Sequence, residues 1–171
     1  EIEKALQEKM SSLAAEGVNV DSITFSGNGE PTIHPDFAKV IDVTLRLRDE
    51  FFPKARVSVL SNATMIGREE IAEALMRIDN PILKIDASSD ELIRMINKPT
   101  GPYRLAEVVE NLRRFEGRFV LQTMFLRSPE FDTASAEALN AWMDIVRDIR
   151  PREIMVYTID RETPDTSLGK Y

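Results

Sequence analysis

The sequence contains no cysteine and only one histidine, His34. Without cysteine, these residues can form neither a disulfide framework nor a thiolate metal site. With one histidine, they exclude a histidine-rich metal site and any catalytic triad that needs a second imidazole. A triad built on His34 alone is unsupported as well, because the sequence has no G-x-S-x-G nucleophile elbow.

The chain also lacks any apolar run near the ~20 residues that span a bilayer. It begins with a charged helical pattern rather than a signal peptide, so we expect no membrane association and a cytoplasmic location. The formal net charge is −7, from 22 basic and 29 acidic residues among 171. This balance disfavours a large phosphate-binding surface and hence a nucleic-acid partner, while a local basic groove is compatible with it.

Two hydrophobic periods alternate along the chain. Apolar residues at helical spacing predict helices, and short runs bounded by turn residues predict strands. The predicted strands are 22–26, 56–60, 82–86, 119–124 and 153–157, and the predicted helices carry residues 2–14, 37–44, 71–76, 91–96, 105–112 and 139–149. Asp36 is expected to cap the second helix, and Asp132 or Thr133 the last one.

This alternation predicts an α/β fold. Strands separated by helices are joined by right-handed crossovers, which give a parallel sheet. The chain begins with a helix, so we expect a further strand before Glu1. The expected architecture is a partial, parallel TIM-like barrel of the (βα)6 type whose first strand is missing, with residues 1–171 forming one partial domain.

The predicted strands have one apolar and one polar face, because side chains alternate along a strand. The apolar face, expected under the helices, holds Ile23, Phe25, Val57, Val59, Leu83, Ile85, Phe119, Leu121, Ile154 and Val156. The opposite face holds Thr24, Ser26, Ser58, Asn62, Lys84, Asp86, Gln122, Met124, Met155 and Tyr157. An ordinary barrel fills its interior with branched apolar side chains, and burying an unpaired polar group costs about 1–3 kcal/mol. We therefore expect an open lumen that holds water and a ligand; the alternative is a hydrogen-bonded polar core or a solvent-facing sheet surface.

A glycine-rich turn, GNGEPT at residues 27–32, follows the first predicted strand. Active sites of parallel barrels gather at such carboxyl ends of strands. The glycines let backbone groups approach a ligand closely, and Pro31 fixes the turn. Glu30 beside exposed carbonyls suits an ammonium group rather than a phosphate, and the spacing is neither G-x-G-x-x-G nor a P-loop. The alternative is a simple turn whose carboxylate faces solvent.

Two segments resemble those of a known family. Residues 25–34, FSGNGEPTIH, are similar to the GGEP-type motif of radical S-adenosylmethionine (radical SAM) enzymes, with Asn28 at the usual second glycine. Residues 60–64, LSNAT, resemble the TNG-type segment that follows the next strand in the same superfamily. The order of elements matches too, so the resemblance covers nearly the whole chain, from the helix after the cluster loop to the sixth barrel strand.

The resemblance implies a cofactor chemistry. Radical SAM enzymes are six-stranded partial barrels that hold a [4Fe-4S] cluster on a CxxxCxxC loop after the first strand. SAM chelates the unique iron and is cleaved reductively to a 5′-deoxyadenosyl radical, which abstracts hydrogen from a substrate. By this resemblance the full-length protein is a metal-binding, oxidoreductase-like iron–sulfur enzyme that acts on an unknown substrate and receives electrons from a donor such as flavodoxin or ferredoxin.

The resemblance also implies a cofactor-binding set, with no catalytic residue assigned. The methionine amino group of SAM would be held by the turn that follows Ser26, namely Gly27, Asn28, Gly29, Glu30 and Pro31. Asn62 would lie near SAM at the mouth of the lumen. Asp86 and Gln122, at later strand ends, would contact the ribose or the carboxylate, and the backbone around Tyr157 would border the adenine.

The lack of cysteine departs from the family pattern, because an iron–sulfur cluster needs thiolates. The missing first strand and the missing cysteines would occupy the same stretch before Glu1. We therefore expect the chain to be part of a larger enzyme whose cluster ligands lie outside these residues, and to be inactive alone. The alternative is a family member that has lost its cluster.

Two other functions stay open. The first is an aldolase-like barrel that forms a Schiff base on Lys84, because a lysine buried in the lumen could have the lowered pKa that such a nucleophile needs. Lys84 could equally be a structural lysine paired with Asp86. The second is a non-catalytic module that binds SAM or another small ligand. His34 is expected to order the turn after Pro31 rather than to catalyse, and Trp142 is expected in the core.

Overall fold

The structure is a computed structural model that describes residues 1–27, 29–160, 163 and 166–171. Asn28, a member of the predicted SAM-binding set, lies outside the described residues. None of the helices in the described ranges is long and apolar enough to cross a membrane.

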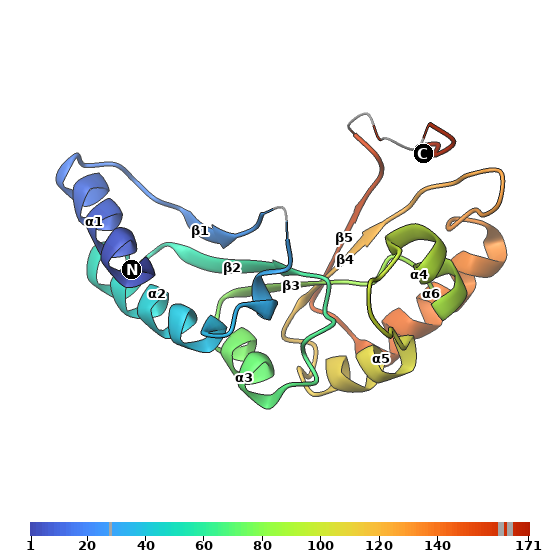
Figure 1. Cartoon of the computed structure of the whole chain (residues 1–171), viewed down its shortest axis with the longest axis horizontal. Coiled ribbons are helices and arrows are strands. Elements are labelled where there is room, and N and C mark those ends of the chain that lie inside the picture. The colour runs from blue at the N-terminus through green and yellow to red at the C-terminus, as the bar shows by residue number, and fades with distance from the viewer. Residues whose placement is uncertain (28, 161–162, 164–165) are drawn as a thin grey trace. The chain divides into compact units, whose positions relative to one another are not determined.

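Helices and strands alternate along the chain, as the hydrophobic periods predicted (Figure 1). The helices are α1 (Ile2–Ala15), α2 (Phe37–Phe51), α3 (Glu69–Arg77), α4 (Asp90–Asn97), α5 (Leu105–Arg113) and α6 (Ala136–Ile149), and η1 (Pro31–Ile33) is a 3₁₀ turn. The strands are β1 (Ser22–Phe25), β2 (Arg56–Ser61), β3 (Asn80–Lys84), β4 (Val120–Met124) and β5 (Glu153–Tyr157).

The five strands form one open sheet in the order β1-β2-β3-β4-β5. β1 pairs in parallel with β2, and β4 pairs in parallel with β5. The α/β fold with a parallel sheet is therefore confirmed. β3 begins and ends two residues earlier than predicted, although Ile85 N–H still donates to the Gln122 carbonyl at 3.0 Å, so pairing with β4 continues past the end of the strand.

The contacts divide the chain into two compact units. Unit 1 comprises residues 1–61 and 65–82, and unit 2 comprises residues 62–64 and 83–171. Unit 1 thus contains α1, β1, η1, α2, β2 and α3 with the first residues of β3. Unit 2 contains the remaining elements, and each unit is described by itself.

The core of unit 1 lies between α1, α2 and the strand that follows α1. The fully or nearly fully buried residues Met10, Leu47, Phe52 and Ala55 form its centre. Partly buried side chains from α1 and β1 pack against them, as the helical spacing of apolar residues predicted. Gly17 follows α1 with φ of +70°, a left-handed conformation that glycine adopts without a steric penalty.

The core of unit 2 joins α6 to the sheet. The indole nitrogen of Trp142 on α6 donates a hydrogen bond to Thr123 Oγ1 on β4 at 3.2 Å, and that hydroxyl donates to the Ile85 carbonyl at 2.7 Å. The Trp142 ring also contacts Phe125 edge to face, with 5.3 Å between centroids. Trp142 is therefore a core residue, as predicted.

The predicted apolar face is largely confirmed. Side chains of three central strands and their ends are almost completely inaccessible, namely Val57, Val59, Leu83, Ile85, Phe119 and Leu121. On the edge strand β5 the prediction is wrong, because Ile154 is 40% and Val156 is 56% exposed. α6, which precedes β5, contacts α5, and its Trp142 bonds Thr123 on β4.

The predicted cap of the last helix is also wrong. α6 begins at Ala136, and Ser135 is its N-cap, with its Oγ accepting from Ala138 N–H at 3.3 Å. Thr133 instead exchanges hydrogen bonds with the backbone of Leu126, and Asp132 Oδ1 accepts from Ala134 N–H at 2.9 Å. Both predicted caps therefore order the loop that precedes the helix. Asp36 does precede α2, but its side chain makes no cap hydrogen bond.

Candidate functional site

The glycine-rich turn of unit 1 presents open backbone. Ser26 and Gly27 follow β1, and both are exposed, as is Gly29. A Cβ atom built on Gly27 or on Gly29 would meet no other group within 4 Å. Packing within the chain therefore does not require glycine at these positions, which is the arrangement expected where a ligand approaches the backbone.

Glu30 organises the end of this turn. One of its carboxylate oxygens, Oε1, accepts hydrogen bonds from Thr32 N–H at 3.1 Å and from the Thr32 hydroxyl at 2.5 Å. Glu30 is thereby the N-cap of η1, with Pro31 in its first turn, and Thr32 is fully buried. Glu30 is partly buried and held by its neighbour, so its carboxylate is not fully exposed; the alternative of a simple turn without a ligand stays open.

His34 orders the turn after Pro31, as predicted. Its Nδ1 accepts a hydrogen bond from Asp36 N–H at 3.1 Å, and its own N–H donates to the Pro31 carbonyl at 3.2 Å. The side chain is exposed. These contacts give His34 a structural role at the entry to α2.

The segment after β2 contains the second motif. Asn62 is exposed, and its Oδ1 accepts from Thr64 N–H at 3.0 Å and from the Thr64 hydroxyl at 2.7 Å. Between them, Ala63 is 1% exposed and has φ of +62°, in the left-handed region that favours glycine. Ala63 stands where the TNG-type segment has its glycine, which explains physically why such a segment would carry glycine there.

A charged pair lies at the end of β3 in unit 2. Lys84 Nζ is 2.9 Å from Asp86 Oδ2, and the Asp86 side chain is completely inaccessible. This contact is an ion pair, and Oδ2 accepts no hydrogen bond from the described residues. The other carboxylate oxygen, Oδ1, accepts from Met124 N–H on β4 at 2.9 Å. Both oxygens of Asp86 therefore have an internal partner.

The environment keeps the Lys84 ammonium charged. Burial by itself lowers the pKa of Lys84, but Asp86 and then the Tyr157 hydroxyl outweigh it, so the net effect raises the pKa above 10.5. A second tyrosine lies close by: burial, and then the carboxylates of Asp86 and Asp90, raise the pKa of Tyr103. Lys84 is consequently an ammonium group at neutral pH, whereas a Schiff-base nucleophile requires a neutral amine.

The predicted polar face is formed by β4 and β5 as well. The parallel register places Gln122 beside Met155 and Met124 beside Tyr157. Gln122 Nε2 lies 3.4 Å from Met155 Sδ, and both side chains are partly exposed. Unit 2 thus brings together the four residues of this face on β4 and β5, and the Tyr157 hydroxyl also contributes to the raised pKa of Lys84.

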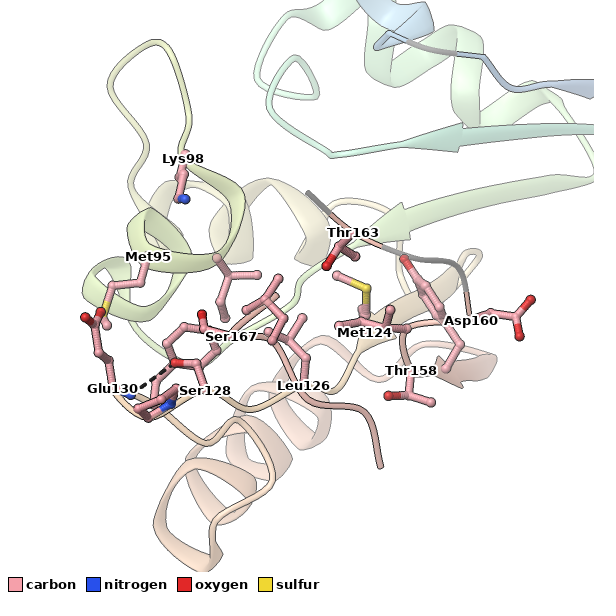
Figure 2. A pocket seen from close by; sticks show the side chains of 16 residues that line it. Met95, Lys98, Met124, Leu126, Ser128, Glu130, Thr158, Asp160, Thr163 and Ser167 are labelled. Carbon is pink, nitrogen blue, oxygen red and sulfur yellow. Dashed lines mark hydrogen bonds between the residues drawn. The ribbon is translucent and has the colours of Figure 1, made fainter. Parts of the chain in front are cut away.

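A pocket of about 790 Å³ opens at the carboxyl ends of β4 and β5 (Figure 2). The sequence predicted that Met124 and Tyr157 lie on the strand face that lines a ligand-holding lumen, and both line this pocket. It did not find the other walls, which come from the end of α4, the loop after β4 and the segment after β5. Those parts carry no motif, and only folding brings them together. The volume lies within the range of small-molecule sites, about 300–1,000 Å³.

The chain offers no ligands for an iron–sulfur cluster. It has no cysteine, and the described residues contain no group of three or more histidine, aspartate or glutamate side chains that could hold a metal ion. The residues present therefore do not fit a [4Fe-4S] cluster.

Comparison with known proteins yields one family. The model of the Radical SAM superfamily matches residues 4–131. The chain is also similar in fold to a domain of pyruvate-formate lyase-activating enzyme from Bacteroides vulgatus, with a TM-score of 0.61, 19% sequence identity, and coverage of 85% of this chain and 86% of that one.

The curated relatives are longer proteins than this chain. A protein named GTPase Obg from Brachyspira hyodysenteriae is 28% identical over 149 residues, which is 85% of this chain and 21% of that protein. A UPF0026 protein of Methanocaldococcus jannaschii is 24% identical over 162 residues, 92% of this chain and 47% of the relative. A UPF0026 protein of Synechocystis is 26% identical over 149 residues, 85% and 52%. The chain thus spans from a fifth to about half the length of these relatives.

Proposed function

Because the chain belongs to the radical SAM superfamily, we propose that it is the SAM-binding core of a radical SAM enzyme. The observation that carries the proposal is the family match over residues 4–131, which includes a turn whose two described glycines face open space. SAM, when bound and reductively cleaved, supplies a 5′-deoxyadenosyl radical that abstracts hydrogen from a substrate. The contribution of this chain is to bind and orient the cofactor.

In this proposal the cluster ligands are supplied outside this chain. The residues present do not fit a cluster. The electron donor, such as flavodoxin or ferredoxin, and the substrate are likewise properties of the whole protein. The chain alone is expected to bind SAM weakly and to be inactive.

The turn of unit 1 would hold the methionine amino group of SAM. An ammonium group needs acceptors, and this turn offers backbone carbonyls next to the Glu30 carboxylate. Thr32 fixes that carboxylate through two hydrogen bonds to Oε1, so Glu30 does not have to be ordered when the ligand binds. Ser26, Gly27, Gly29 and Pro31 supply the backbone of the same turn.

In unit 2 the proposed contacts come from exposed or partly exposed groups. Asn62 and Gln122 are accessible and carry amide groups suited to the ribose or the carboxylate of SAM. Tyr157 is 39% exposed and would border the adenine. Asp86 is 1% exposed, so we assign it a positioning role in which it holds Lys84 and the amide of Met124.

The test is SAM binding by the chain, followed through backbone amide shifts in ¹⁵N NMR spectra. SAM is expected to shift the Gly27 and Gly29 amides, and Glu30→Gln is expected to weaken binding. Methylthioadenosine, which lacks the amino-acid part of SAM, should leave the chemical shifts of both glycine amides unchanged. Glu16→Gln is the matched control, because Glu16 is an exposed carboxylate of the same unit that bonds to Ser12. Binding of SAM with no shift at either glycine would contradict the proposed role of the turn.

The other two functions have distinct outcomes. The raised pKa of Lys84 disfavours a Schiff-base enzyme, and borohydride trapping of a carbonyl substrate on Lys84 would revive it. A non-catalytic module would bind SAM but form no 5′-deoxyadenosine when a cluster and a reductant are supplied with the whole protein. Formation of 5′-deoxyadenosine under those conditions supports the enzyme.

A further inference from the structure

A short strap, residues 166–171, forms part of the wall of the pocket at the carboxyl ends of β4 and β5. Two of its residues, Ser167 and Leu168, line the pocket together with Tyr157. Figure 2 shows Ser167 beside the same space as Met124. The proposed function puts the adenine of SAM next to Tyr157, so a ligand bound there would also contact the strap.

The strap is anchored to the loop after β4 and to the end of β5. Arg127 and Gly169 form an antiparallel bridge in which each backbone N–H donates to the carbonyl of the other, at 3.1 and 2.7 Å. The backbone N–H of Tyr171 donates to Thr158 Oγ1 at 3.0 Å, and its hydroxyl donates to Asp132. The Arg127 guanidinium lies 5.5 Å from the centroid of the Tyr171 ring, which is within cation–π range. Arg127 or Tyr171 therefore takes part in each of these contacts.

The two sides of this bridge differ in how firmly they are packed. On the loop side, Thr133 is 3% exposed, and its hydroxyl exchanges hydrogen bonds with the backbone of Leu126, which is 1% exposed. On the strap side, Tyr171 is 51% exposed, and Ser167 and Lys170 are exposed as well. A segment held by exposed contacts opens locally at a lower free energy than the packed parts of the same domain. The strap should therefore open while the loop stays in place.

We propose that Arg127 and Tyr171 are positioning residues, which hold the strap closed against a ligand in this pocket and thereby control the release of that ligand. A ligand in contact with Ser167 and Leu168 binds the closed strap better than the open one. By linkage, its binding must in turn stabilise the closed strap. Identifying this ligand as SAM rests on the proposed function, whereas the opening of the strap does not.

Hydrogen exchange of backbone amides in the chain measures the opening of the strap. The reporter is the Gly169 amide, which donates to the Arg127 carbonyl, and the reference is the Thr133 amide, which donates within the loop at 3.1 Å. We expect Tyr171→Phe to speed exchange at Gly169 by about 2–10-fold, the range that one hydrogen bond supports. Exchange at Thr133 should not change. Lys170→Ala is the control, because it changes an exposed side chain of the same strap and should leave both amides unaffected.

The role in ligand release is tested with methylthioadenosine, the nucleoside part of SAM. Its binding is expected to slow exchange at Gly169 in the native chain, and NMR line shapes measure its dissociation rate. It should dissociate about 5–50-fold faster from Tyr171→Ala, because a hydrogen bond and a cation–π contact of the closed strap are lost. Tyr171→Phe keeps the ring beside Arg127, so its dissociation rate should fall between those of Tyr171→Ala and the native chain.

Several results would overturn the inference. Exchange at Gly169 as slow as at Thr133 means that the strap does not open, and exchange unchanged in Tyr171→Ala means that this anchor does not hold it. Methylthioadenosine that binds without slowing exchange at Gly169 is not coupled to the strap. SAM that shifts Gly27 and Gly29 while methylthioadenosine does not bind keeps the proposed function and removes the adenine from this pocket. Failure of both ligands to bind removes the proposed function, and the role in release falls with it.

Discussion

The ammonium group of Lys84 lies 2.9 Å from the carboxylate of Asp86, a side chain with no solvent exposure. Asp86 in turn accepts a hydrogen bond from Met124 N–H, so the pair ties the end of β3 to β4. Lys84 keeps 26% of its side chain exposed, and the Tyr157 hydroxyl helps Asp86 to raise its pKa. The pair therefore links a buried structural charge to a residue that lines the pocket.

Removing one partner of this pair should lower the free energy of unfolding. Lys84→Met leaves the Asp86 carboxylate buried without its counter-charge, and breaking a buried pair in this way costs about 3–5 kcal/mol. Because Lys84 is partly exposed, we expect the loss in free energy of unfolding to be smaller, about 1–3 kcal/mol. Urea unfolding of Lys84→Met, Asp86→Asn and the double variant measures it. Additive effects of the two single changes would contradict a direct interaction.

The same pair predicts a dependence of stability on alkaline pH. The pKa of Lys84 in the folded chain is raised above its ordinary value of 10.5. Its stabilising contribution is therefore fully present below that value and is lost as pH rises through the folded pKa. The difference in unfolding free energy between the native chain and Asp86→Asn should stay constant from about pH 7 to about pH 9 and shrink above about pH 10.5. A difference that grows with alkaline pH would contradict the assigned direction.

Ala63 occupies a conformation that glycine tolerates better. Its φ of +62° carries a steric penalty for alanine of about 1–2 kcal/mol. Its methyl group is 1% exposed, so replacing it by glycine also removes packing. We expect Ala63→Gly to stabilise the chain by up to about 1 kcal/mol, and Ala63→Val to destabilise it by more than that, because a branched side chain suits positive φ least. Thermal unfolding of both variants checks this, and a stabilising valine would show that the strain is absent.

Ser135 is the position where the start of α6 should be most sensitive. Ser135→Ala removes the acceptor for Ala138 N–H and should cost about 0.5–2 kcal/mol, while Ser135→Asp should restore most of it. Urea unfolding monitored by circular dichroism measures the change. Glu137→Gln provides a control within the same turn that leaves the cap in place. If alanine at 135 has no effect, the helix begins elsewhere.

Much of the fold could be predicted because its signals are local. The apolar spacing of α2 and α3 and the short runs of β2 and β5 depend on neighbouring residues alone, and all four elements lie where the sequence placed them. The start of α6 could not be fixed in this way. Asp132, Thr133 and Ser135 are all good cap residues, and the choice among them depends on which ones the loop uses for its own hydrogen bonds.

The candidate site also has residues that the sequence identified and residues that only the structure identified. The residues of the turn after β1 and of the segment after β2 were identifiable because each motif is continuous in sequence. The burial of Asp86 and the raised pKa of Lys84 were not, since they depend on how β3, β4 and β5 are paired. That the chain forms one domain, and that the predicted set binds SAM, stay predictions.

The sequence by itself determined the alternation of helices and strands, the family, and the absence of cluster ligands, because these follow from residue types and their spacing. Only the tertiary structure decided that Lys84 is a paired ammonium and that Ile154 and Val156 lie uncovered. It alone also produced the pocket, which is lined by the end of α4, the ends of β4 and β5, and Ser167 and Leu168 near the end of the chain. The physical reason is that burial, pKa and cavity shape depend on which distant segments pack together, and local spacing carries no information about that.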